Sequence, residues 1–149
     1  MRRIPSLLVM LALAASATAT HAAPGNELYM VVNARNPIQG LAMRDAVALY
    51  TGRVHTFPDG REAEAFDQSD TGGTRASFYR ALTGMDLARI NSYWARLRFS
   101  GQVQPPRSLG DDKDMLAMVK SNPRAIGYLR TAPADASVRV VLVLADAAE

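Results

Sequence analysis

Residues 66–82 read "FDQSDTGGTRASFYRAL". This stretch begins as a strand-like run, continues through Ser, Asp, Thr and two glycines, and then takes up a helical pattern near Thr74. Glycines permit a tight turn, and the first N–H groups of a helix have no partner within the helix. A loop of such N–H groups at a helix N-terminus attracts anions. The stretch therefore predicts either an anion-binding loop or only the start of a helix.

Two interpretations of this loop are open. In the first, backbone N–H groups and the Ser and Thr hydroxyls hold a phosphate, sulfate or carboxylate. The ligand-binding residues are then Ser69, Asp70, Gly72, Gly73 and Thr74. In the second, Asp70 or Thr71 accepts a hydrogen bond from a backbone N–H and caps the helix, which stabilises it by about 1 kcal/mol. A helix dipole without a paired cation predicts weak binding, about millimolar, in the first case.

Residues 1–23 have the layout of a secretory signal peptide. Two arginines precede an apolar run over residues 7–15, and small residues follow up to Ala23. The apolar run is shorter than the roughly 20 residues that span a bilayer. We expect cleavage near Ala23, export to the periplasm, and a single domain over residues 24–149 with no membrane span after cleavage.

Composition narrows the class of protein further. The formal net charge is +3, and about +1 without the two arginines of the leader, and we see no basic patch that would indicate nucleic acid binding. The chain has no cysteine, which excludes disulfides and thiolate metal sites. His55 is the only histidine outside the leader, so a multi-histidine metal site is impossible. The acidic run 111–114 lacks the glycine and distal glutamate of a calcium loop and complements a helix dipole. We therefore expect no catalytic residue, no metal and no cofactor.

Hydrophobic periodicity predicts the element order β, α, β, α, α, α, β, β. Strands are predicted at 27–34, 62–66, 125–130 and 137–144, and helices at 41–52, 74–84, 85–101 and 111–123. The second strand is expected to lie at a sheet edge and the last to be buried. The segment 101–110 is expected to be a loop, because two adjacent prolines forbid regular structure.

Some side chains on the predicted helices are expected to be buried. In the first helix, Met43, Val47 and Tyr50 fall on one face, with Ala46 beside them. In the third, Tyr93 and Trp94 are expected to pack in the core rather than to stack on a ligand, since aromatic side chains dominate cores.

Three segments resemble periplasmic phosphate-binding proteins, in the same order along the chain. Residues 31–60 resemble a strand and helix followed by "LGRxTxWPDG", and "VKSNPRAIGYL" resembles a helix-to-strand step containing "NPGAIGYV". Between them, "SDTGGTRASFYRAL" resembles the family's anion loop, typically Arg-Ser-Asp-Gly-Ser-Gly-Thr before a helix. The resemblance covers most of residues 29–130. It implies an α/β fold, a single lobe of the type II periplasmic-binding-protein superfamily, with a mixed sheet and helices on its faces.

The loop also departs from the family motif. Gln68 stands where the motif has arginine, and a glutamine supplies neither the charge nor the fork geometry for phosphate. Thr71 and Gly72 stand where the motif has Gly and Ser. Arg75 is close in sequence, but we expect it to lie inside the helix and to point outward. The chain also has room for only one of the two lobes that close on the ligand in the family.

The resemblance implies an exported, non-enzymatic solute- or anion-binding protein. It would correspond to one lobe of an ABC-transporter phosphate-binding protein, linked to uptake or sensing of phosphate or another oxyanion, which it binds weakly. The alternative is a ligand-free lobe that acts as a protein–protein interaction module in the cell envelope. Such a module would dock an envelope protein or a second copy through the lobe-closing face, which includes the anion loop and the turn at 36–39.

Overall fold

The computed structural model describes residues 27–101 and 103–146. The predicted leader therefore lies outside the described residues. The elements are β1 (Glu27–Asn33), α1 (Met43–Tyr50), β2 (Glu64–Gln68), the 3₁₀ turn η1 (Asp70–Gly72), α2 (Thr74–Thr83), α3 (Leu87–Phe99), β3 (Arg107–Leu109), α4 (Asp112–Ser121), β4 (Ala125–Leu129) and β5 (Val138–Ala145). No helix in these two ranges is long and apolar enough to cross a membrane.

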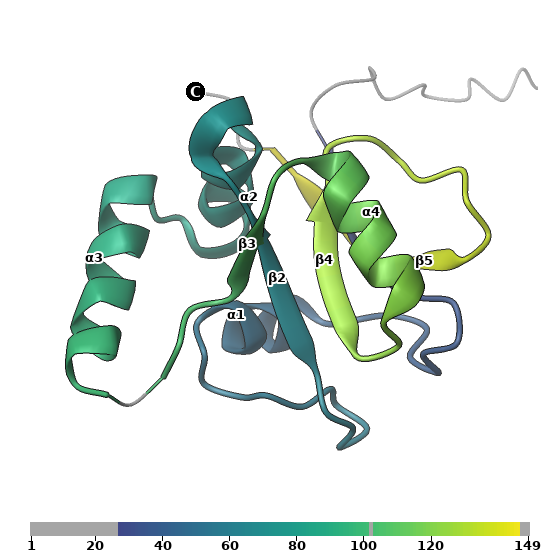
Figure 1. The fold of residues 1–149 in the computed structure, drawn as a ribbon, viewed down its shortest axis with the longest axis horizontal. Coiled ribbons are helices and arrows are strands. Elements are labelled where there is room, and N and C mark those ends of the chain that lie inside the picture. The colour runs from purple at the N-terminus through teal and green to yellow at the C-terminus, as the bar shows by residue number, and fades with distance from the viewer. Residues whose placement is uncertain (1–26, 102, 147–149) are drawn as a thin grey trace, which may run out of the picture.

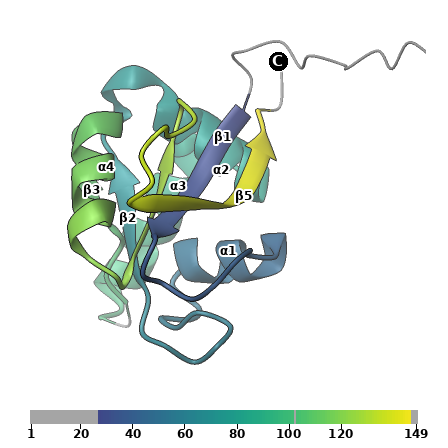
Figure 2. The same ribbon diagram turned by 90° about the vertical axis from the view of Figure 1, so that its right-hand side faces the viewer.

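The strands form one five-stranded mixed sheet in the order β3-β2-β4-β1-β5. β2 runs parallel to β3 and β4, whereas β1 runs antiparallel to β4 and β5. Helix α4 covers one face of the sheet, and α1 and α2 lie on the other (Figures 1 and 2). The predicted α/β class and the mixed sheet with helices on its faces are therefore confirmed.

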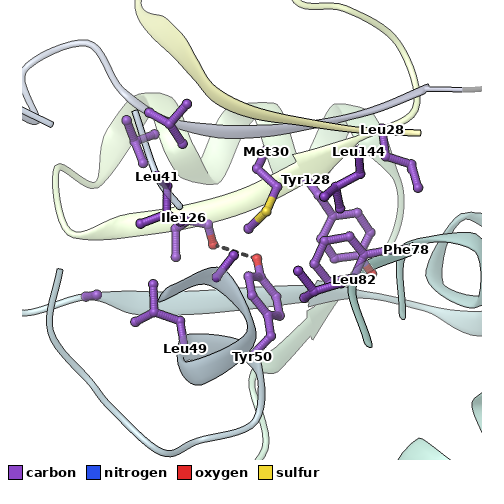
Figure 3. Close-up of a cluster of buried hydrophobic side chains, with 14 of the residues drawn as sticks. Leu28, Met30, Leu41, Leu49, Tyr50, Phe78, Leu82, Ile126, Tyr128 and Leu144 are labelled. Atoms are coloured by element: carbon purple, nitrogen blue, oxygen red, sulfur yellow. Dashed lines mark hydrogen bonds between the residues drawn. The ribbon is translucent and has the colours of Figure 1, made fainter. Parts of the chain in front are cut away.

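The larger hydrophobic core fills the face that carries α1, α2 and α3. At its centre, the rings of Phe78 and Tyr128 stack with their centroids 3.6 Å apart. The Tyr50 ring meets Phe78 edge-on, and its hydroxyl donates to the carbonyl oxygens of Phe66 and Ile126 at 2.9 and 3.2 Å (Figure 3). Because the hydroxyl has two acceptors, Tyr50 is buried without an unsatisfied polar atom, and it ties α1 to the sheet.

The smaller core lies under α4. Met115 and Val119 of α4 pack against the sheet, where they meet Gly127 of β4. A Cβ atom at Gly127 would overlap the Met115 side chain, and it would come within 3.3 Å of Val119. Glycine at this position therefore lets the helix approach the strand closely.

Three expectations about the strands are corrected. β2 is an interior strand rather than an edge strand, because β3 pairs alongside it. The segment expected to be a loop contributes β3, since pairing begins at Arg107, immediately after the prolines. β5 lies at the edge of the sheet and is only partly buried, with Val143 47% exposed. An apolar run looks buried in sequence whether one or both of its faces are covered.

The helices lie where they were predicted, but α1 buries a different set of residues from the one expected. α1 begins at Met43, which is 45% exposed, and its buried residues are Ala46, Leu49 and Tyr50. The expectation that Met43 is buried is therefore wrong. Trp94 is buried in the core as predicted, with 3% of its surface exposed. Tyr93 is half-buried, and its hydroxyl donates to the Thr51 carbonyl.

Candidate functional site

The candidate anion loop connects the end of β2 to the start of α2. After Ser69 the chain makes the 3₁₀ turn Asp70–Gly72, and Gly73 then takes a left-handed conformation with φ +72°. Only glycine adopts this conformation without strain, which explains why a glycine directly precedes the helix. The residues of the turn are exposed, and the first hydrogen bond into α2 runs from the Ser77 N–H to the Gly73 carbonyl.

Neither residue that we expected to cap α2 does so. No side chain accepts a hydrogen bond at the N-terminus of this helix. The Asp70 carboxylate instead accepts from Arg75, and the Thr71 hydroxyl pairs with the Ser69 hydroxyl at 2.9 Å. The Ser69 hydroxyl also donates to the Gly110 carbonyl at 2.8 Å. The expectation that Asp70 or Thr71 caps α2 is therefore wrong, because the side chains of the loop bind to one another, to Arg75 and to the segment before α4.

The expectation that Arg75 points outward is wrong. Its side chain is only 11% exposed. The Nε atom donates to Asp67 Oδ2 at 2.8 Å, and Nη1 donates to Asp70 Oδ1 at 2.8 Å and to Asn91 Oδ1 at 3.0 Å. Arg75 lies four positions before Tyr79, on the same face of the helix. This spacing was the available signal that a cation lies beside the loop.

The acceptor at the centre of this network is Asp67, which sequence reasoning missed. Its carboxylate is buried in β2 and also accepts from the hydroxyls of Tyr79 and Tyr128 and from the Gln68 N–H. Burial lowers the pKa of the Arg75 guanidinium, but the hydrogen bond and charge of Asp67, joined by Asp70, outweigh burial and raise that pKa. Burial, followed by the charge of Asp67, raises the pKa of Tyr79 and Tyr128. The carboxylate is thus held by a permanent cation and two neutral phenols.

Gln68 occupies the position where the resembled motif has arginine, but its side chain is directed away from Arg75. Its Nε2 atom donates to Asp112 Oδ1 at 2.8 Å and to the Tyr128 carbonyl at 2.9 Å. Successive residues of a strand point to opposite faces of the sheet, so Asp67 faces α2 whereas Gln68 faces α4. The cation near the loop is therefore Arg75, supplied by the helix rather than by the strand.

A pocket of about 450 Å³ lies beside the loop. It is bordered by the end of β2, by α3 and by the segment that enters β3. Its lining comprises Asp67, Gln68, Ser69, Asp70, Arg75, Asn91, Trp94, Arg98, Pro105, Pro106 and Ser108. Of the five predicted ligand-binding residues, Ser69 and Asp70 line this pocket, whereas Gly72, Gly73 and Thr74 lie outside its lining. The structure thus brings two arginines and part of the loop together around one cavity.

The candidates for other chemistry do not gather into a site. Among the residues that the structure describes, no group of three or more His, Asp or Glu side chains is placed to hold a metal ion. Asp111 caps α4 by accepting from the Asp114 N–H at 3.0 Å, as expected for an acidic run that starts a helix. His55 lines a separate pocket with Glu64 and Arg107.

The sheet order, the helix that follows β2 and the glycine loop between them make up an α/β fold that resembles part of known solute-binding proteins. Solved structures share it. A phosphate ABC transporter substrate-binding protein from Clostridium perfringens, solved with bound phosphate, has a TM-score of 0.61 and 18% identity, covering 78% of this chain and 44% of that one. An ABC-type phosphate transport receptor from Vibrio cholerae has a TM-score of 0.60 and 20% identity over 78% of this chain and 45% of that one.

A third solved structure, PstS from Borrelia burgdorferi, has a TM-score of 0.51 and 9% identity, covering 82% of this chain and 58% of that one. No family model matches the sequence, and no curated protein matches it. The chain spans about half the length of the first two of these solved proteins. At these identities the likeness shows the fold alone.

Proposed function

We propose that this protein is an exported, non-enzymatic solute-binding lobe that holds an oxyanion, phosphate in the first place, at the loop from Ser69 to Thr74. The observation that carries the proposal is the buried guanidinium of Arg75 beside that loop. A helix N-terminus alone binds anions weakly, and a neighbouring guanidinium adds charge and paired donors. The likeness to phosphate-binding proteins supports the choice of ligand.

The donors of this site come from two directions. In the proposed complex, the N–H groups of Gly73 and Thr74 contact the anion from the helix, with the Thr74 hydroxyl beside them. The Nη2 atom of Arg75 makes no hydrogen bond with any residue that the structure describes, whereas Nε and Nη1 are both used. Arg75 therefore retains a donor for a ligand while its charge stays anchored by Asp67.

Asp70 sets the limit on affinity and selectivity. Its side chain is 56% exposed and carries a negative charge next to the proposed ligand. A carboxylate repels a fully ionised anion but accepts a hydrogen bond from a protonated phosphate oxygen. We therefore expect preference for phosphate over sulfate, and weak, salt-sensitive binding of about millimolar strength.

The test is calorimetric titration of phosphate and sulfate into the wild type and the Gly72→Asp variant. Gly72 is exposed, and a Cβ there meets only the Thr74 hydroxyl, at 3.9 Å, so the substitution adds a repelling charge without disturbing the packing. Ser92→Asp, on the exposed surface of α3, adds the same charge elsewhere and serves as the control. We expect Gly72→Asp alone to abolish binding. Absence of phosphate binding by the wild type would contradict the proposal and favour the ligand-free interaction module.

The export part of the proposal rests on the leader pattern at residues 1–23 and has its own test. Mass spectrometry of the protein from a periplasmic extract should find an N-terminus within a residue or two of Ala23. Recovery of the uncut chain in the membrane fraction would contradict export with cleavage. A link to phosphate uptake or sensing is part of the same proposal, and it predicts that the amount of protein responds to phosphate starvation.

A further inference from the structure

The pocket beside the loop is larger than an inorganic oxyanion needs. Its volume of about 450 Å³ falls within the roughly 300–1,000 Å³ typical of sites for organic ligands. A tetrahedral oxyanion fills only a few times the roughly 30 Å³ that one water takes up in the liquid. The residues Gly73 and Thr74, which would contact the oxyanion, lie outside the lining. Ser69, Asp70 and Arg75 do line the pocket, so the proposed anion site adjoins space that phosphate alone would leave empty.

Two polar residues of the lining come from α3. Asn91 and Arg98 lie seven residues apart, two helical turns, and both line the pocket. Asn91 accepts from Arg75 through its carbonyl oxygen, which leaves its amide NH₂ without a partner among the described residues. Arg98 is exposed and forms no ion pair within the described part of the chain, whereas Arg75 is bound to Asp67 and Asp70. Arg98 is thus the cation in the lining that is available to pair with an anionic ligand.

The apolar part of the lining comes from Trp94 of α3 and from the two prolines before β3. Pro105 and Pro106 are half-buried and have no N–H to donate, and Trp94 packs beside them. Trp94 is 3% exposed, so only the edge of its side chain borders the pocket.

We propose that the natural ligand is a small organic anion, a carboxylate or phosphate monoester with a compact apolar body. Its anionic group pairs with Arg98 and the free Nη2 donor of Arg75, and its body lies against Trp94 and the two prolines. This inference rests on the proposed function and narrows it from inorganic oxyanions to organic anions.

The test uses the fluorescence of Trp94, the single tryptophan of the chain. Phenyl phosphate, benzoate and inorganic phosphate are titrated into the wild type and into two variants, Arg98→Ala and Arg96→Ala. Arg96 is the matched control, because it lies on the same helix but lines a different pocket with Arg89 and Tyr93. We expect phenyl phosphate to bind at least about tenfold more tightly than inorganic phosphate and to change the tryptophan emission. Arg98→Ala should weaken it about tenfold, the loss expected for one charged hydrogen bond, and Arg96→Ala should not.

The outcomes separate this inference from the function on which it rests. If inorganic phosphate binds and Gly72→Asp abolishes that binding, but neither organic anion binds more tightly and Arg98→Ala has no effect, the organic-ligand inference is wrong and the oxyanion function stands. If phenyl phosphate binding depends on Arg98 but not on Gly72, the organic-ligand inference holds and the loop is not the anion site. If none of the three anions binds, both proposals are wrong.

Discussion

Arg75 of α2 and Asp67 of β2 form a buried ion pair, with Arg75 Nε 2.8 Å from Asp67 Oδ2. The two residues flank the glycine loop, because Asp67 lies in the strand before it and Arg75 lies in the first turn of the helix after it. Both side chains are almost fully buried, with 11% and 5% of their surfaces exposed. The pair therefore holds the loop closed at its base and fixes where its N–H groups lie.

Arg75→Ala should destabilise the protein by about 3 kcal/mol, because it leaves the Asp67 carboxylate buried without its cation. Arg75→Lys should recover only part of this loss. The planar guanidinium binds Asp67 and Asp70 through two different nitrogen atoms, whereas lysine has a single nitrogen atom. The measurement is urea unfolding, with the exposed Arg89→Ala as the control. A loss below about 0.5 kcal/mol, the usual effect of a surface substitution, would show that the tyrosines alone satisfy Asp67.

Asp86→Ala should lower stability by about 1 kcal/mol, because Asp86 caps α3 by accepting from the Arg89 N–H at 2.8 Å. Thr71→Ala should change it by less than about 0.5 kcal/mol, because Thr71 is exposed and caps nothing. Thermal melts of the two variants compare the two positions. Equal losses would mean that the loop before α2 is capped after all.

Gly127→Ala should destabilise the protein by about 1–3 kcal/mol, through overpacking between β4 and α4. The new methyl group would overlap Met115. Combining it with Met115→Ala should cost less than the sum of the two single losses, because the truncated side chain makes room. Gly40→Ala is the control, since a Cβ there meets only the Val141 carbonyl oxygen, at 3.8 Å. Additive losses in the double variant would argue against a shared contact.

Alkaline pH should unfold the protein cooperatively. Burial is the largest cause that raises the pKa of Tyr50, Tyr79 and Tyr128 above 10.0. Since their folded-state pKa exceeds the unfolded value, the stability they confer is fully present below about pH 10 and is lost as the pH rises above it. Tyrosinate absorbance and circular dichroism should therefore change together for these three residues. Ionisation of all tyrosines before any loss of structure would contradict their burial.

Gln68→Arg should not increase phosphate affinity, although it restores the arginine of the resembled motif. The Gln68 side chain faces α4 and contacts Asp112, so a guanidinium there would pair with Asp112 rather than with a ligand at the loop. Phosphate titration of this variant beside the wild type is the measurement. An affinity gain of tenfold or more, about 1.4 kcal/mol, would show that the side chain can turn toward the loop.

The sheet and its helices were largely predictable from sequence, because apolar periodicity and glycine or aspartate caps are local signals. Gly84, for example, ends α2 in a left-handed conformation with φ +73°. β3 was not predictable in this way, since it contains one apolar residue in three and its place is set by pairing with β2. The edge position of β5 likewise depends on the order of the whole sheet, in which β1 pairs with β4 on its other side. No single segment of the sequence contains this information.

The loop was recognisable from sequence, but its charge was not. Asp67 lies in a strand with no local feature that marks it as an ion-pair partner, and its four donors come from β2, α2 and β4. The helical spacing of Arg75 and Tyr79 was the one visible clue. The motif position at Gln68 therefore holds no cation, although the fold supplies one, Arg75, from the next helix.

The pairing of β1 with β5 has a practical consequence for this chain. Glu27, the first residue of β1, lies opposite Ala145, the last residue of β5, so both strands reach the same corner of the molecule (Figure 2). A few linker residues would join these two positions. New termini could then be opened at an exposed turn such as Asp59-Gly60, which lies before β2 and outside the glycine loop. Such a circular permutant would carry a reporter domain at a chosen site and leave every strand of the sheet intact.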